Sequence, residues 1–211
     1  MGLRDVVGLV AIALTASTEA AVIGIDFGAR FVKVGIIQPG VGIELVLTEA
    51  TKRKSAAAAG FNTQNERVYG DEAYNLVGKI PHKQFIFSKL MLGKNATSDE
   101  IKSFKHLGYP YAFEPDADTG AAVLRLGENQ TYRPEELVAF VLSYAKQIAE
   151  NHAGGKAEIK DAVITVPAYF RETERRAMLS AASIAGLNVL SLMHEQTAFA
   201  FKYGFDKEAE F

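Results

Sequence analysis

The sequence predicts an α/β fold in which one mixed sheet is completed by helical crossover connections. Its N-terminal part contains three strand-like segments separated by short turns. Its C-terminal part alternates helix, strand, helix, strand and helix. An antiparallel meander followed by crossover helices describes a single sheet with helices packed on it. The length of 211 residues, with 48% hydrophobic and 23% charged residues, suits one domain or two small subdomains with a real core.

The meander occupies the first part of the chain after residue 21. Its strands are expected at residues 22–26, 31–38 and 42–48. Gly28 marks the first turn and the Pro39-Gly40 pair marks the second, because these residue types favour turn conformations. A Lys-Arg-Lys run follows at residues 52–54, and we interpret it as a solvated turn.

The middle of the chain has shorter and less regular elements. We expect a small-residue strand at a subdomain crossing, an extended segment, three short helices and two strands, in this order: residues 55–61, 66–70, 71–79, 85–92, 98–107, 111–113 and 121–126. Asp71 and Ser98 suit the N-cap positions of the first and third of these helices. Pro81 ends the first helix, because proline cannot continue it.

The helix expected at residues 134–153 has the clearest signal in the chain. Pro134 suits the first helical position, and Glu135 and Glu136 complement the positive end of the helix dipole. Its apolar residues recur at helical spacing, and we interpret this stripe as core: Leu137, Phe140, Val141, Tyr144 and Ile148. The remaining elements are a strand closed by Pro167, a helix stopped by Gly186, a strand and a final helix, at residues 161–166, 172–185, 188–193 and 195–203.

Charge and cysteine content exclude several classes of function. The net charge is −2 and the pI is about 6.1, a balance that favours neither nucleic acid nor an anionic membrane surface as a partner. The chain has no cysteine, so it offers no disulfide framework, no thiolate metal site and no thiol nucleophile.

Residues 1–20 are expected to be a secretory signal peptide that is cut between Ala20 and Ala21. Their apolar run is too short to span a bilayer, which needs roughly 20 residues. The alternative is a buried N-terminal strand or helix, but the folded pattern restarts at Val22. Asn95 and Asn129 each begin an Asn-X-Thr glycosylation sequon, which is useful only in a secretory lumen. These features predict a lumenal protein with no membrane contact after cleavage.

The segment GIDFGARFVKVG, residues 24–35, is the first candidate for chemistry. Consecutive backbone N–H groups in such a turn bind anions well, and Gly28 lets phosphate oxygens approach the backbone. Asp26, at the end of a strand, is suited to hold a water on Mg²⁺. The alternative is a plain Asp-X-Gly hairpin, and this segment alone favours the hairpin.

Several segments in the second half of the chain carry a resemblance. They are DAVITVPAYF, ERR, AGLNVL, EQTA and YGFD, which begin at residues 161, 174, 185, 195 and 203. In this order they resemble the nucleotide-binding domain of the seventy-kilodalton heat-shock chaperones, and the resemblance extends over nearly all of residues 22–207. It implies an actin-like ATPase fold, also called ribonuclease H-like. The chain is then the first lobe, with core parts at 21–55 and 134–211 and a smaller inserted subdomain at 56–133.

Residues 39–61, PGVGIELVLTEATKRKSAAAAGF, are most similar to the large lumenal class of these chaperones, the glucose-regulated and hypoxia-up-regulated type. This resemblance implies a chaperone of the endoplasmic reticulum lumen that acts in the stress response. Its partners would be unfolded client proteins and the lumenal chaperone BiP, for which it would be a nucleotide-exchange factor and holdase. The alternative is an ATP-hydrolysing, peptide-binding chaperone of the BiP type. A sugar kinase or an actin-like filament protein is disfavoured by DAVITVPAYF and EQTA.

The resemblance also implies a site for ATP or ADP with Mg²⁺. Asp26 and Gly28 match the first phosphate loop, and Asp26 would reach the metal through water. Lys89 matches the catalytic lysine that contacts the terminal phosphate and the attacking water, where its charge would stabilise the transferred group. Glu195 matches the acid near the magnesium. The structural alternatives are a surface lysine and a glutamate that is favoured in the first turn of a helix.

Pro167 and Arg175 match the proline and arginine that relay nucleotide state to the substrate-binding domain. Their structural alternatives are a strand terminator and a solvated helix residue. The family has hydroxyl residues after the loop glycine, whereas this chain has Ala29 and Arg30, and Gln196 replaces the usual proline. Arg30 can neutralise phosphate charge but cannot replace a compact hydroxyl. We therefore expect nucleotide binding to survive better than hydrolysis.

The family's second phosphate loop would follow shortly after residue 206 and does not occur in the sequence. We therefore expect the second lobe, most of the adenosine pocket and the substrate-binding domain to be absent from this chain. With half of the nucleotide site missing, we expect it not to hydrolyse ATP.

Overall fold

A computed structural model describes residues 21–106, 109, 111–126, 130–155 and 158–206. The expected signal peptide at residues 1–20 and the sequon residue Asn129 lie outside this part of the chain.

The core of the molecule is a mixed six-stranded sheet. Its strand order is β12-β11-β1-β2-β3, and β4 also pairs with β2. The strands are β1 (Val22–Phe27), β2 (Phe31–Gln38), β3 (Gly42–Leu45), β4 (Ser55–Ala56), β11 (Asp161–Val166) and β12 (Asn188–His194). Strands β1, β2 and β3 pair antiparallel, whereas β11 pairs parallel with both β1 and β12. The expected meander with parallel crossovers is confirmed.

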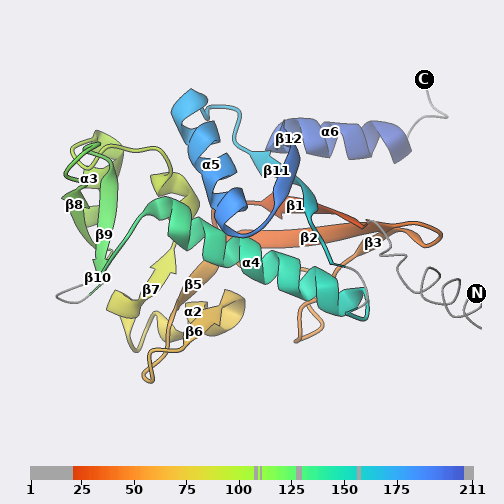
Figure 1. Ribbon diagram of the computed structural model, residues 1–211, viewed down its shortest axis with the longest axis horizontal. Coiled ribbons are helices and arrows are strands. Elements are labelled where there is room, and N and C mark those ends of the chain that lie inside the picture. Colours follow the sequence, from red (N-terminus) through yellow and green to blue (C-terminus); the bar gives the residue numbers. More distant parts are fainter. Residues whose placement is uncertain (1–20, 107–108, 110, 127–129, 156–157, 207–211) are drawn as a thin grey trace, which may run out of the picture.

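Three helices accompany this sheet, namely α4 (Pro134–His152), α5 (Glu172–Ile184) and α6 (Glu195–Asp206). Figure 1 shows α4 running across the strands β1 and β2, with α6 at the side opposite to α3 and β8. Alternate residues of β1 and β2 are buried, including Ile23, Ile25 and Val34, because these side chains share the face that α4 covers. The expected apolar stripe of α4 is buried throughout.

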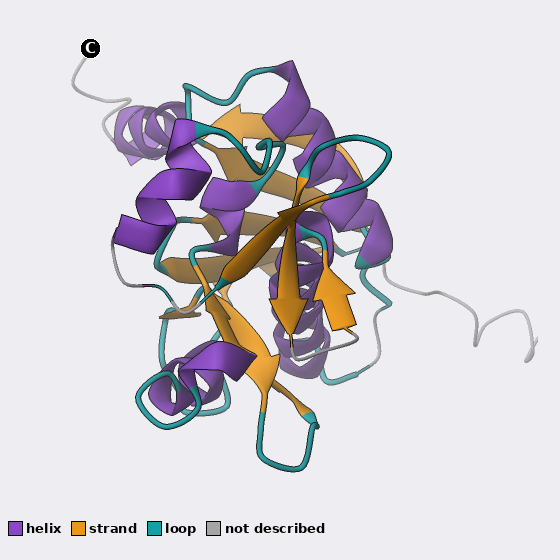
Figure 2. Ribbon diagram, turned by 90° about the vertical axis from the view of Figure 1, so that its left-hand side faces the viewer, coloured by secondary structure: helices purple, strands orange, loops and turns teal. Residues whose placement is uncertain are grey.

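The segment between β4 and α4 builds two further three-stranded sheets, with strand orders β6-β5-β7 and β10-β9-β8. The strands are β5 (Ala58–Phe61), β6 (Arg67–Tyr69), β7 (Gln84–Ile86), β8 (Ala112–Pro115), β9 (Ala122–Leu126) and β10 (Gln130–Tyr132). The helices are α2 (Gly70–Leu76), α3 (Asp99–His106) and the short 3₁₀ helices η1 (Pro81–Lys83) and η2 (Ser88–Met91). Figure 2 views the molecule from the side on which these elements lie.

Three expectations for this region need correction, and one strand was missed. The helix expected at 85–92 is wrong, because β7 is followed by Phe87 with a φ of +61° and then by η2. The strand expected at 55–61 divides into β4 in the core sheet and β5 in a small sheet. Strand β10 was not expected. Asp71 does not cap α2, since Tyr69 holds that position and the Asp71 carboxylate instead accepts the Ala56 N–H.

The capping role of Ser98 is confirmed, because the Ile101 N–H donates to Ser98 Oγ over 3.3 Å. Among the described residues, no helix has both the length and the apolar character needed to cross a membrane.

Glu174 connects α5 to the segment between β4 and α4. Its carboxylate accepts hydrogen bonds from the Lys94 ammonium at 2.8 Å and from the Thr173 hydroxyl at 2.9 Å. Gly93 approaches so closely that a Cβ there would lie 2.9 Å from the Glu174 nitrogen. Burial acts to raise the pKa of Glu174, but the hydrogen bonds from Lys94, the backbone and Thr173 outweigh burial and lower that pKa to about 2.

This carboxylate makes stability dependent on acid. Because the pKa of Glu174 in the folded protein lies below its ordinary value of 4.5, the unfolded chain binds more protons at this group than the folded chain does between pH 4.5 and about 2. The free energy of unfolding that the Glu174 carboxylate contributes is therefore fully present above pH 4.5, and it is lost as the pH falls toward 2. We predict that Glu174→Gln lowers stability at pH 6 and weakens the acid dependence seen by urea unfolding at pH 6, 4 and 3.

The matched control is Glu172→Gln on the same helix, because the Glu172 carboxylate is 75% exposed in its pair with Arg176. Equal pH profiles for the two variants would contradict this assignment.

Candidate functional site

The turn between β1 and β2 is the first part of the site. In the antiparallel register Asp26 lies opposite Lys33, and Phe27 lies opposite Val32. The Gly28 N–H donates to the Phe31 carbonyl over 2.9 Å. A Cβ at Gly28 would come within 3.1 Å of the same carbonyl, so this close approach favours glycine.

The backbone N–H groups of the turn divide into two kinds. The Gly28 N–H already donates to the Phe31 carbonyl within the turn, so it is not available to a ligand. The N–H groups of Ala29 and Arg30 donate to no acceptor in the part of the chain that the structure describes. Two adjacent amides without acceptors at a tight turn are suited to bind an anion.

Lys89 is the most unusual charged residue of the site, because its side chain is only 1% exposed. Its ammonium donates to the carbonyl oxygen of Phe27 and, over 2.5 Å, to Oε1 of Glu195. Lys89 lies on η2, directly after the left-handed Phe87. This backbone conformation is rare for a bulky residue and costs free energy, which is typical of functional sites.

Burial lowers the pKa of the Lys89 ammonium, while the hydrogen bond and charge of Glu195 and the charge of Asp26 act against this shift. Glu195 is the first residue of α6, and its side chain is 33% exposed. The pair thus has one end in the protein interior and one end open to solvent. The solvent-exposed end is the Glu195 carboxylate, so a ligand reaches the Lys89 ammonium only past this residue.

Asp26 joins the same cluster through Thr165 of β11. The Thr165 hydroxyl accepts the buried N–H of Phe27 at 2.9 Å and donates to Oδ1 of Asp26 at 3.3 Å. Oδ2 of Asp26 accepts from the Lys33 ammonium at 2.9 Å. Asp26, Lys89 and Glu195 are therefore brought together at the end of β1, as the resemblance implies.

The cluster has limited capacity for a metal. Among the described residues no group of three or more acidic or histidine side chains could hold an ion. The Asp26 carboxylate is 48% exposed, which suits contact with a hydrated Mg²⁺ through water.

Pro167 and Arg175 lie beside the cluster and are linked to it. The Phe170 N–H donates to the Pro167 carbonyl at 3.1 Å, and Nε of Arg175 donates to the Phe170 carbonyl at 2.9 Å. Nη2 of Arg175 also donates to Nε2 of His194 at 2.7 Å. These hydrogen bonds connect Pro167 to His194, the residue that precedes Glu195.

The two sequons differ in what the structure describes. Asn95 is exposed, and its Oδ1 accepts from the Thr97 hydroxyl at 2.9 Å, so the side chain is accessible to modification. Asn129 lies outside the described residues.

Three residues of the site were not identified from the sequence: Lys33, Thr165 and His194. Thr165 had a detectable signal, since it is a polar residue inside the apolar strand 161–166. The hairpin register would have placed Lys33 opposite Asp26. No sequence signal pointed to His194.

Comparisons with known proteins extend over nearly all of the described residues. A family model described as "Hsp70 protein" matches residues 22–210. The chain is 39% identical over 192 residues to Hypoxia up-regulated protein 1 of Xenopus laevis, and 39% identical over 197 residues to that of Danio rerio. It is 36% identical over 198 residues to that of Homo sapiens.

These alignments cover 90%, 93% and 93% of this chain, but only 29%, 20% and 19% of the three relatives. The chain therefore spans less than a third of the length of these relatives.

The Lys89–Glu195 pair predicts an asymmetric effect of mutation. Glu195→Gln leaves a buried ammonium without its counter-charge and is expected to cost about 1–3 kcal/mol of unfolding free energy. Lys89→Met removes the buried charge and leaves Glu195 able to contact water, so its cost is expected to be less than about 1 kcal/mol. Urea unfolding of both variants measures this difference.

The double variant Lys89→Met/Glu195→Gln completes the cycle and should resemble Lys89→Met alone. A larger loss for Lys89→Met than for Glu195→Gln would contradict the account of a cation that is costly to bury.

Proposed function

The chain belongs to the Hsp70 family, and from this premise we propose that the cluster around Asp26, Lys89 and Glu195 binds the phosphate groups of ATP or ADP with Mg²⁺. The observation that carries the proposal is the buried Lys89 ammonium at the end of β1, which is held by the Phe27 carbonyl and by the partly exposed Glu195. Burying an ammonium is unfavourable for folding, and such groups concentrate at functional sites.

Each residue of the cluster has a distinct contribution. The N–H groups of Ala29 and Arg30 would donate to phosphate oxygens, and the Arg30 guanidinium would add positive charge. Lys89, held by the Phe27 carbonyl and Glu195, would approach the terminal phosphate. Bound Mg²⁺ would neutralise phosphate charge, with Asp26 and Glu195 contacting its waters. Thr165 fixes the orientation of Asp26.

The residue pair Ala29-Arg30 favours binding over hydrolysis. Phosphoryl transfer to water depends on accurate positioning of the attacking water. Ala29 has no polar side-chain atom that could orient this water, whereas the amides that bind phosphate do not depend on side-chain identity. We therefore propose that the site holds nucleotide and hydrolyses it slowly at most.

For the whole protein we propose a stress-response chaperone of the endoplasmic reticulum lumen. It would act on unfolded proteins as a holdase and on BiP as a nucleotide-exchange factor. The support is the similarity to relatives named Hypoxia up-regulated protein 1, together with the leader-like residues 1–20 and the exposed sequon residue Asn95. The relay Pro167–Phe170–Arg175–His194 would report nucleotide state to other parts of the protein.

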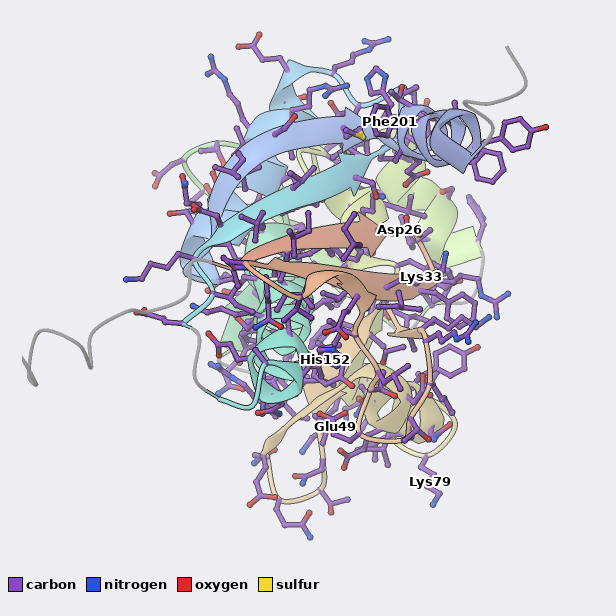
Figure 3. All side chains as sticks on the ribbon, turned by 90° about the vertical axis from the view of Figure 1, so that its right-hand side faces the viewer. Asp26, Lys33, Glu49, Lys79, His152 and Phe201 are labelled. Atoms are coloured by element: carbon purple, nitrogen blue, oxygen red, sulfur yellow. The ribbon has the colours of Figure 1, made fainter. Side chains whose placement is uncertain are left out.

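Nucleotide binding is tested by thermal unfolding with Mg·ATP. We predict weak binding and a rise in Tm of about 3–6 °C when ATP exceeds its Kd about tenfold. Lys89→Met should abolish this rise, whereas Lys79→Met, at an exposed lysine far from the site, should preserve it (Figure 3). Steady-state hydrolysis should stay at background. Equal loss in both variants, or rapid hydrolysis, would contradict the proposal.

The exchange activity is tested with BiP loaded with a fluorescent ADP analogue. Excess chain is expected to accelerate release of the analogue, and serum albumin at the same concentration is the control. Unchanged release at chain concentrations that bind BiP would count against an exchange role for these residues, while leaving the nucleotide site untouched.

A further inference from the structure

A groove of about 550 Å³ lies beside the β1–β2 turn. Phe31 and Lys33 of β2 face it, and they alternate with the buried Val32 and Val34, so the groove lies on the face of the sheet that α4 does not cover. Its volume is in the range of small-ligand sites. The groove is lined by Phe31, Lys33, Leu45, Lys52, Arg53, Lys54 and Asp71.

Four basic residues and one acidic residue contribute to the lining, although the surface of the groove itself is mostly apolar. Lys52 is paired with Asp71 at 2.7 Å, and the pKa of Asp71 is lowered chiefly by this hydrogen bond, with Lys54 also contributing. Within the described residues Arg53 and Lys54 form no ion pair. The basic run at 52–54, which the sequence presents as a solvated turn, thus lines a groove with uncompensated positive charge.

An aromatic ring positions part of this charge. The Lys54 ammonium lies 4.2 Å from the centre of the Phe31 ring, and the Arg30 guanidinium lies 5.7 Å from it. Cation–π contact orders these side chains without neutralising them. The ammonium of Lys54 therefore remains available to an anion.

Lys33 connects the groove to Asp26. Lys33 lines the groove, and its ammonium pairs with Asp26 at 2.9 Å; the two side chains are 50% and 48% exposed. Figure 3 shows Asp26 and Lys33 next to each other. An exposed ion pair of this kind contributes little to stability, so Lys33 can leave Asp26 for another anion at a small cost in free energy.

We propose that this groove is a second anion site, which binds a phosphate-bearing ligand through Lys33, Arg53 and Lys54, and that Lys33 moves from Asp26 to the bound phosphate. The site adjoins the cradle of Ala29, Arg30 and Lys89, but none of these three residues lines the groove. Occupancy of the groove leaves Asp26 free to contact a metal, and metal contact at Asp26 releases Lys33 to the groove. Such coupling is reciprocal by thermodynamic linkage.

The test is a calorimetric titration of the chain with pyrophosphate at low ionic strength, where charges are weakly screened. The variant Arg53→Gln/Lys54→Gln is expected to lose about tenfold or more in affinity, because it removes two charge-assisted contacts. Lys79→Gln removes an exposed lysine at a distance from the groove and should change affinity less than about twofold. Equal losses would show only a general charge effect and would overturn the proposal.

Lys89→Met separates this site from the cradle. Pyrophosphate binding should survive this substitution, because Lys89 does not line the groove. Loss of binding would place the anion in the cradle and overturn the second site. Failure of ATP to bind at the cradle would leave the expected pyrophosphate result unchanged.

The movement of Lys33 is tested by a double-mutant cycle. Asp26→Asn should increase pyrophosphate affinity, and the increase should be smaller when Lys33→Gln is also present. The same increase in both backgrounds would contradict the exchange of Lys33.

Competition by ADP distinguishes the source of the phosphate. Displacement of pyrophosphate by ADP would identify a nucleotide as the ligand of the groove. Pyrophosphate binding that ADP does not displace would identify a phosphate group from another source.

Discussion

The buried ammonium of Lys89 is the interaction on which the site depends. It joins three segments that are distant in the sequence, namely the end of β1 through the Phe27 carbonyl, η2, and the start of α6 through Glu195. A buried cation is tolerated only where hydrogen bonds and an opposite charge are held in place. The left-handed Phe87 and the sheet that holds Phe27 are therefore requirements of the site as well as features of the fold.

The same arrangement explains how the β1–β2 turn would bind nucleotide phosphate without supporting its hydrolysis. Gly28 uses its N–H to close the turn, whereas the amides of Ala29 and Arg30 remain available. Phosphate recognition by a backbone survives side-chain substitution, but positioning of a nucleophilic water does not. Membership of the Hsp70 family is thus compatible with a site that holds nucleotide more effectively than it hydrolyses it.

The sequence predicted the core sheet well, because its strands and crossover helices carry clear apolar patterns. It failed where a long-range contact decided the local structure. Asp71 has the composition of a helix cap but is held by Ala56 and Lys52. The apolar run at 85–92 suits a helix or a strand, and the left-handed Phe87 has no sequence signature. Strand β10 lacks an apolar alternation that would reveal it.

The site was predictable in a different way. Composition and spacing alone would place Lys89 on the surface, and only the resemblance to a family indicated its role. The structure places Lys89 in the interior, where its ammonium donates to the Phe27 carbonyl and has Glu195 as counter-charge. Thr165 and Lys33 became visible only through strand pairing, since their contacts to Asp26 cross from β11 and β2.

The central claim is that phosphate binds at the Ala29 and Arg30 amides beside Lys89. The most direct measurement is an amide NMR titration of the chain with Mg·ADP. The account predicts that the largest shifts occur at Ala29 and Arg30, with smaller shifts at Ser88 and Lys89. Shifts confined to other regions, such as the exposed aromatic residues of α6, with an unchanged turn, would contradict it.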